Sequence, residues 1–201
     1  MGVTGASGAI FARRVLQMLE SDSRVERVHL VISGSGLKVI SEELKLKFSR
    51  SPGIPMQLAG GPTSKTIYLL DSDIGASIAS GSYPVDGMVV IPCSTGCLAQ
   101  VANGISSTLI ERAADVSLKE RRKLILAVRD TPLNRIHLEN MLRAHEAGAV
   151  IFPIIPSFYH EPETVSELVT QFCCRLLAHF ELRQDEQFCW MGEKRPERGR
   201  G

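Results

Sequence analysis

The sequence predicts an α/β fold in which a parallel β-sheet lies between two layers of helices. Short apolar runs are continuous, as in strands that are buried on both faces of a sheet. The stretches between these runs carry apolar residues at helical spacing, which is the alternation expected of a doubly wound sheet. With 201 residues, of which 44% are hydrophobic, the chain can build one such core. We therefore expect a single domain over residues 1–190, without internal repeats.

The strands are predicted from runs of β-branched and other large apolar residues. The first strand is almost absent, because the glycine-rich corner "GVTGASG" begins at Gly2. The later strands are predicted over "VERVHLVIS" (25–33), "DGMVVIPCS" (86–94), "KLILAVR" (123–129) and "AVIFPIIP" (149–156).

Helices are predicted where apolar residues recur three or four positions apart. An amphipathic run follows the glycine-rich corner directly, and Gly148 closes a later helix. The other helices are expected over 36–45, 97–122 with an interruption near Gly104, 134–148 and 163–183. Residues 49–64 are rich in proline, glycine and serine and are predicted to form a long loop, and residues 191–201 a disordered tail.

Composition narrows the class of protein. The net charge is +1, which gives no global sign of binding to nucleic acid or to a membrane surface. No apolar run approaches the ~18 residues of a membrane span, and no charged-then-apolar leader is present, so we expect a cytoplasmic protein. The five cysteines include no CxxC pair, and two are adjacent, which favours reduced, buried thiols over disulfides or zinc. His137 and His145 are too far apart to share a metal, and we assign none.

The opening corner indicates an anion site. Small residues between a strand and a helix expose backbone N–H groups at the positive end of the helix. "GVTGASG" is not GxGxxG and contains no GK[ST], which disfavours a dinucleotide and leaves a mononucleotide such as FMN open. It lacks GxSxG as well, so a hydrolase is not supported. The alternative is a tight turn in which Ser7 merely caps the helix.

Four side chains are predicted to converge on one edge of the sheet. In doubly wound sheets, ligands bind beyond the carboxyl ends of the strands, near the point where strand order reverses. Ser33, Ser94 and Arg129 each follow an apolar strand, and Ser7 follows the first strand. We expect all four side chains at this rim.

Six motifs together resemble the flavin prenyltransferase family of the UbiX type, from Gly2 to about Trp190. They are "TGASGA", "ASGS", "PCSTG", "ERAADVSLKERR", "TPLNRIHLENML" and "FYHEPET". The resemblance implies a flavodoxin-like, Rossmann-type, doubly wound parallel sheet and a homo-oligomer, expected to be a dodecamer. It implies an enzyme that joins the dimethylallyl group of dimethylallyl phosphate to reduced FMN. The product, prenylated FMN, would pass to a UbiD-type decarboxylase.

The resemblance also implies roles for individual residues. It assigns catalytic roles to Ser7, Arg129 and Asp130, and it matches Trp190 to an aromatic near the allyl group. Tyr159 and Arg175 are expected where neighbouring subunits meet. The implied flavin-binding residues are Gly5, Ala6, Ser7, Ser33, Ser94, Thr95, Gly96, Cys97 and Arg129. The implied donor-binding residues are Ser80, Arg112, Lys119, Tyr159 and Arg175.

Basic residues offer a way to stabilise a leaving phosphate without a metal. Arg112 and Lys119 are two helical turns apart and can share one face, whereas 121–123 are expected to be solvated. No DDxxD motif that would hold Mg²⁺ is present, and fixed cations can do the same electrostatic work. Apolar positions around 98–110 and 165–180 exceed what one sheet requires, and we expect subunit contacts there.

Four features depart from the family pattern, one of which is that the few residues that normally precede "GVTGASG" are lacking. Asp130 stands where the family has glutamate, Cys97 where it has threonine, and "SGSG" (33–36) where it has "SKxA". The shorter carboxylate keeps open an FMN-binding homologue with weak or lost transferase activity. A related flavin-dependent decarboxylase that acts on cysteinyl groups is a further alternative, although its His and Asn signature is not found in the expected context.

Overall fold

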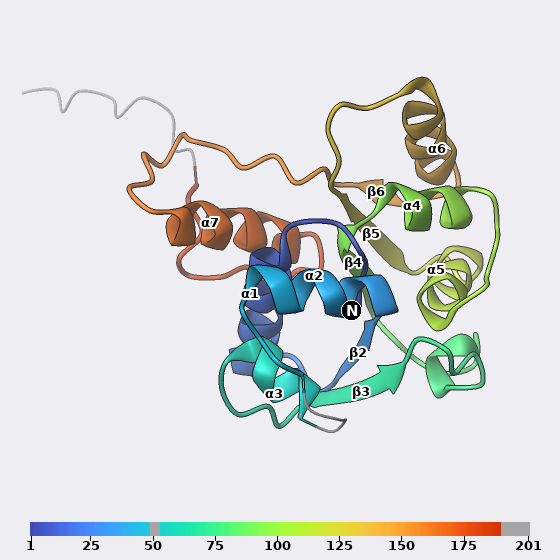
Figure 1. Ribbon diagram of the computed structural model, residues 1–201, viewed down its shortest axis with the longest axis horizontal. Coiled ribbons are helices and arrows are strands. Elements are labelled where there is room, and N and C mark those ends of the chain that lie inside the picture. Colours follow the sequence, from blue (N-terminus) through green and yellow to red (C-terminus); the bar gives the residue numbers. More distant parts are fainter. Residues whose placement is uncertain (49–52, 190–201) are drawn as a thin grey trace, which may run out of the picture.

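A parallel sheet of six strands forms the middle layer of the computed structural model, which describes residues 1–48 and 53–189 (Figure 1). The strand order is β3-β2-β1-β4-β5-β6, and every pairing between neighbours is parallel. The doubly wound parallel sheet predicted from the sequence is confirmed. The strands are β1 (Gly2–Val3), β2 (Val28–Ile32), β3 (Thr66–Leu70), β4 (Gly87–Cys93), β5 (Lys123–Val128) and β6 (Val150–Ile151).

Helices cover both faces of this sheet (Figure 1). On one face α1 (Ala9–Ser21) packs against α7 (Val165–Ala178), and on the other α4 (Thr95–Ala102) packs against α5 (Leu109–Lys119). The remaining helices are α2 (Gly34–Glu43), α3 (Ile54–Ala59), the 3₁₀ helix η1 (Ser77–Ala79) and α6 (Arg135–Glu146). Within the described residues, no helix is both long and apolar enough to cross a membrane.

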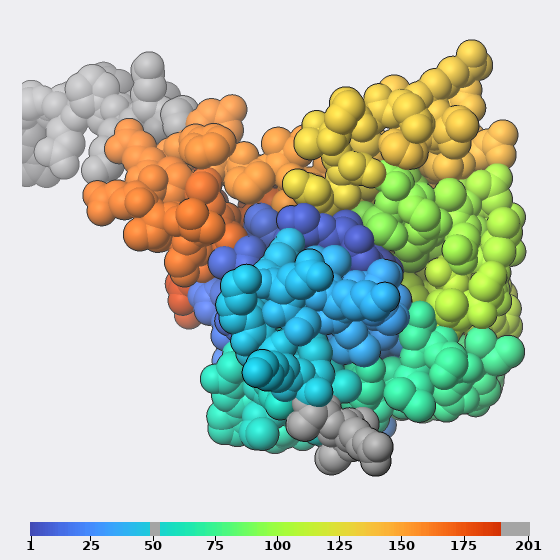
Figure 2. Space-filling model, viewed as in Figure 1, coloured from blue at the N-terminus to red at the C-terminus, as the bar shows by residue number. Residues whose placement is uncertain are grey.

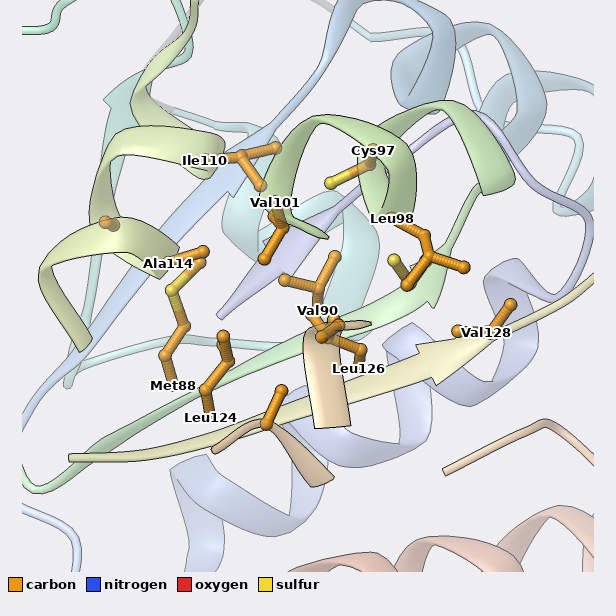
Figure 3. Close-up of a cluster of buried hydrophobic side chains, with 14 of the residues drawn as sticks. Met88, Val90, Cys97, Leu98, Val101, Ile110, Ala114, Leu124, Leu126 and Val128 are labelled. Carbon is orange, nitrogen blue, oxygen red and sulfur yellow. The ribbon is translucent and has the colours of Figure 1, made fainter. Parts of the chain in front are cut away.

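The alternation of side chains along β4 explains the two cores. Met88 and Val90 point into a cluster with α4 and α5, as Figure 3 shows. Val89 and Ile91 point to the opposite face and pack with α1 and α7. Because both faces of the strand are buried, the run contains no polar residue, and this made the strand recognisable from the sequence.

The structure differs from the sequence-based expectation at two edges. The predicted loop over 49–64 contains α3, which carries a proline in its first turn and buries Ile54 and Leu58. The edge strand β3 was not predicted, because its side chains are only half-buried and Ile67 and Leu70 are exposed.

Other segments are shorter than predicted. The strand expected over 149–156 is confined to β6, although N–H groups of Phe152 and Ile154 still donate to β5 carbonyls. The last helix ends at Ala178, before Glu181 takes a positive φ. Trp190 and the predicted tail over 191–201 lie outside the described residues.

A crevice of about 790 Å³ opens at the amino edge of the sheet. It is lined by Met1 and by residues of β2 and β4. His29 and Tyr83 line it and form a hydrogen bond of 3.2 Å between the imidazole Nε2 and the phenol oxygen. This crevice is at the end of the sheet opposite to Ser7, Ser94 and Arg129, and it is not the predicted site.

Candidate active site

Four turns lie side by side at the carboxyl edge of the sheet, because they follow four neighbouring parallel strands. Residues 4–8 follow β1, 33–36 follow β2, 94–97 follow β4, and 129–130 follow β5. The order of strands reverses between β1 and β4, where such sheets bind ligands. The structure thus places Ser7, Ser33, Ser94 and Arg129 at one rim, as expected from the sequence.

Close packing between the first two turns explains one of the glycines. A Cβ atom on Gly5 would lie 2.5 Å from both Cβ and Oγ of Ser35. The Ser33 N–H donates to the Val3 carbonyl over 3.0 Å, which ties the same two turns through their backbones. The first turn therefore requires a residue without a side chain at position 5.

Three helices begin at this rim, and two of them carry serine caps. The Ser33 hydroxyl accepts the Gly36 N–H at the start of α2 (3.0 Å), and the Ser94 hydroxyl accepts the Cys97 N–H at the start of α4 (3.3 Å). The first N–H groups of a helix have no acceptor within the helix, and they carry partial positive charge. Space is open where Gly34 would carry a side chain. This arrangement suits a phosphate.

Glu43, which was not predicted as a site residue, accepts hydrogen bonds at the amino end of α1, the third helix that begins at this rim. Its carboxylate accepts the N–H of Ala9 (2.8 Å) and of Gly8 (3.0 Å), and the Ser7 hydroxyl bonds to it as well. Partial burial acts to raise the pKa of Glu43, but these donors and the nearby Arg129 outweigh it and hold the pKa below its usual value. No local signal connects Glu43 with a turn 35 residues earlier in the chain.

The start of α1 is thus neither the predicted open anion site, because the Glu43 carboxylate accepts the Gly8 and Ala9 N–H groups, nor a turn in which Ser7 caps the helix. Gly8, with a φ of 118°, is the N-cap of α1, so the N-cap residue has no side chain that could accept an N–H of the first turn. Ser7 instead points its hydroxyl toward Glu43. Ile154, from the segment after β6, would lie 3.6 Å from a Cβ atom on Gly8, so this segment borders the corner.

Asp130 is tied to the amino end of α4. Its Oδ2 accepts the Thr95 hydroxyl over 3.2 Å, and its Oδ1 accepts the Thr131 N–H over 2.8 Å. The Arg129 N–H donates to the Cys93 carbonyl over 3.0 Å. These bonds orient an exposed Arg129–Asp130 pair beside the turn that carries Ser94.

The side chain of Cys97 lies in the core rather than at the rim (Figure 3). Contact with the Cys93 thiol and burial raise the pKa of Cys97 well above its usual value. A thiol in this state is not a nucleophile. The replacement of the family's threonine by Cys97 therefore affects a side chain in the hydrophobic core.

Three predicted donor-binding residues, Ser80, Arg112 and Lys119, make their side-chain contacts outside the four turns of the rim. Arg112 is held by Asp115 (2.8 Å) and by the Ala79 carbonyl (3.2 Å). Lys119, the last residue of α5, forms an ion pair with Glu120 close to Gly81, and Ser80 lies next to Gly81. Because β5 begins four residues after Lys119, Lys119 is at the amino edge of the sheet, and the strand from Lys123 to Arg129 spans about 20 Å.

Tyr159 and Arg175 flank a different part of the surface. Arg175, on α7, lines a shallow pocket of about 190 Å³ with Phe152, Phe172 and Ser157. Tyr159 is 73% exposed on the long segment between β6 and α7. Among the residues that the structure describes, no group of three or more His, Cys, Asp or Glu side chains is arranged to hold a metal ion.

Comparisons of the sequence and of the structure with known proteins find flavoproteins of the UbiX type. Residues 1–174 match the sequence profile of the family described as Flavoprotein. The full chain is 42% identical to the flavin prenyltransferase UbiX of Halalkalibacterium halodurans, of which it covers 96%. The crystal structure of AnUbiX in complex with FMN and dimethylallyl pyrophosphate is similar, with a TM-score of 0.82, 38% identity and 96% of each chain covered. A dodecameric FMN-dependent UbiX-like decarboxylase from Escherichia coli O157:H7 has a TM-score of 0.83 and 39% identity, covering 95% of this chain and 97% of that one.

Proposed function

The chain belongs to the flavoprotein family and, within it, to the UbiX-type flavin prenyltransferases, and we propose that it transfers the dimethylallyl group of dimethylallyl phosphate to reduced FMN. The product is prenylated FMN, and phosphate leaves. The observation that carries this conclusion is the full-length similarity to a flavin prenyltransferase. It is supported by the strand order, which brings the turns that contain the predicted flavin-binding residues to one edge of the sheet.

The rim fits FMN. The amino ends of α2 and α4, with their Ser33 and Ser94 hydroxyls, offer the donors and the positive potential that a phosphate requires. Gly34 and Gly96 leave room for a ligand to approach the backbone. When bound in its reduced form, FMN supplies the electron-rich ring that accepts the dimethylallyl group. Gly5, Ala6, Thr95 and the backbone of Cys97 complete the proposed flavin site.

Three residues are proposed to carry the chemistry. Arg129 offers a fixed cation beside the flavin, which favours negative charge on the reduced ring. Asp130, oriented by Thr95, holds or moves a proton as the new bond forms. Ser7, oriented by Glu43, positions the reacting end of the donor.

We further propose that the donor site is completed between copies of the chain. Ser80, Arg112 and Lys119 make their side-chain contacts outside the four turns of their own rim, and Tyr159 and Arg175 are exposed. In a dodecamer such as that of the similar decarboxylase, these residues would face the rim of a neighbouring copy. There the cations would neutralise the departing phosphate. The prenylated FMN would then pass to a UbiD-type decarboxylase.

One assay tests the activity. The purified protein is incubated anaerobically with FMN, a reductant and dimethylallyl phosphate, and the mass of the extracted flavin is measured by mass spectrometry. We expect a flavin heavier by one isoprene unit. Binding of FMN without any heavier product would refute transferase activity and favour the FMN-binding homologue. Release of NAD or FAD from the purified protein would refute the assignment of FMN to this site.

The same assay tests the metal requirement. We expect turnover to persist in EDTA, because Arg112, Lys119 and Arg175 supply the positive charge that Mg²⁺ would otherwise provide. Adding Mg²⁺ to the chelated protein serves as the control. An absolute requirement for Mg²⁺ would contradict this proposal.

A further inference from the structure

Thr4 is a buried polar residue that joins the two turns on either side of the strand-order reversal. It is only 4% exposed. Its hydroxyl donates to the Pro92 carbonyl over 2.9 Å and accepts the Ser94 N–H over 2.7 Å. Its own N–H donates to the same Pro92 carbonyl over 3.1 Å. The side chain thus uses both its donor and its acceptor capacity on β4 and the turn that follows it.

This link differs from the backbone ties between neighbouring turns of the rim. The bonds from Ser33 to Val3 and from Arg129 to Cys93 run between backbone atoms, so no substitution removes them directly. The bond to Ser94 passes through a side chain. Ser94 in turn caps α4 by accepting the Cys97 N–H. The Thr4 hydroxyl therefore holds both the start of α4 and the turn that begins at Gly5.

We infer that Thr4 is a positioning residue, whose hydroxyl sets the spacing between the Gly5–Ser7 turn and the Ser94–Gly96 turn, and thereby sets the affinity for FMN. The inference rests on the proposed function, because FMN is taken to lie between these turns. Thr4 itself is buried beneath them and acts through Ser94 and Pro92. A buried N–H that loses its acceptor seeks another one, which displaces the chain that carries it.

The test compares Thr4→Val, which keeps the shape and removes the hydroxyl, with Thr4→Ser, which keeps the hydroxyl. Ser117→Ala is the matched control, because the Ser117 hydroxyl is also buried and bonds to the Ala113 carbonyl (2.8 Å) far from the rim. We expect Thr4→Val to weaken FMN binding about tenfold, the loss expected for one hydrogen bond. Thr4→Ser should restore binding to the parent level, and Ser117→Ala should lower the melting temperature without changing FMN affinity.

Hydrogen exchange in the protein without FMN provides a readout that does not depend on the proposed function. Thr4→Val should accelerate amide exchange in residues 94–97, and Ser117→Ala should not. Unchanged exchange there, or parent-like FMN affinity in Thr4→Val, would overturn the inference. Should Thr4→Val not fold, Thr4→Cys has a weak acceptor in the same place and should change both readouts in the same direction. A parent protein that binds no FMN would refute the proposed function instead, and the exchange comparison would still decide the role of Thr4.

Discussion

At the scale of single residues, the rim differs from the family pattern most at Asp130. The carboxylate is one methylene shorter than the family's glutamate, yet it is well oriented by Thr95 and Thr131. A general acid or base must approach its proton to about 2.6–3.2 Å, directly or through one water. We therefore expect the shorter side chain to affect the rate of proton transfer, whereas the proposed phosphate contacts involve other residues.

We predict that Asp130→Glu raises turnover and that Asp130→Asn nearly abolishes it. Loss of a positioned acid or base typically lowers the rate by ~10²–10⁴-fold. Steady-state formation of the heavier flavin measures the rate, and a fluorescence titration with FMN provides the control. FMN should bind both variants, because Asp130 is proposed to transfer a proton and is not among the proposed FMN-binding residues. Turnover of Asp130→Asn at the parent rate would show that the Arg129–Asp130 pair is only a strand end.

The contact between Gly5 and Ser35 gives a second prediction at this scale. Gly5→Ala should destabilise the protein by about 1–3 kcal/mol, as expected for overpacking, and should weaken FMN binding. Urea unfolding and FMN titration measure the two effects. The double variant Gly5→Ala with Ser35→Gly removes the atoms that clash and should recover most of both losses. Additive losses in the double variant would contradict the proposed contact.

At the scale of elements, β2 carries a half-buried histidine that links stability to pH. Burial lowers the pKa of His29, and the nearby Met1 amino group and Arg27 lower it further. The neutral ring bonds to Tyr83, and Arg27 donates to the same phenol oxygen over 3.3 Å. Because the unfolded chain binds the proton more readily, neutral His29 contributes stability that is fully present above pH ~6.5.

We predict that the free energy of unfolding falls as the pH drops below about 6.5, through the lowered pKa of folded His29. Urea unfolding between pH 8 and pH 5 measures the effect, and His29→Asn should reduce its slope. The Met1 amino group, whose pKa burial lowers to about 5, titrates in the same direction, so part of the slope remains in the variant. A variant with an unchanged slope would show that His29 is not responsible.

At the scale of the whole molecule, exposed apolar side chains occur in the two predicted contact ranges, at Ile105 and Val165, and also on α6. The apolar face of α7 packs against the sheet of its own chain, with Phe172 and Leu176 buried. On α6, by contrast, Ile136, Leu138 and Leu142 are each more than half exposed. This helix stands out at one corner of the molecule (Figure 2). Leu138 and Leu142 are one helical turn apart and share a face of α6, and adjoining exposed apolar side chains mark protein–protein contacts.

We predict that α6 contributes to the contact between copies. The double substitution Leu138→Asp with Leu142→Asp places charges in that contact and should yield a smaller assembly in light scattering at micromolar concentration. Met56→Asp, at an exposed apolar position on α3, is the matched control and should leave the assembly unchanged. The circular dichroism spectrum should stay that of the parent. A parent-sized assembly in the α6 variant, or a monomeric parent protein, would contradict the prediction.

The sequence by itself determined the doubly wound sheet and the rim, because both follow from local patterns. Continuous apolar runs report strands buried on two faces, and Ser33, Ser94 and Arg129 lie together since parallel strands end at one edge. The half-exposed β3 escaped prediction because its pattern carries little burial signal. Only the tertiary structure brought Glu43 to the start of α1, joined Thr4 to Ser94, and placed Lys119 far from Arg129. Those relations depend on strand order and helix length, which bring together or separate residues that are distant in the chain.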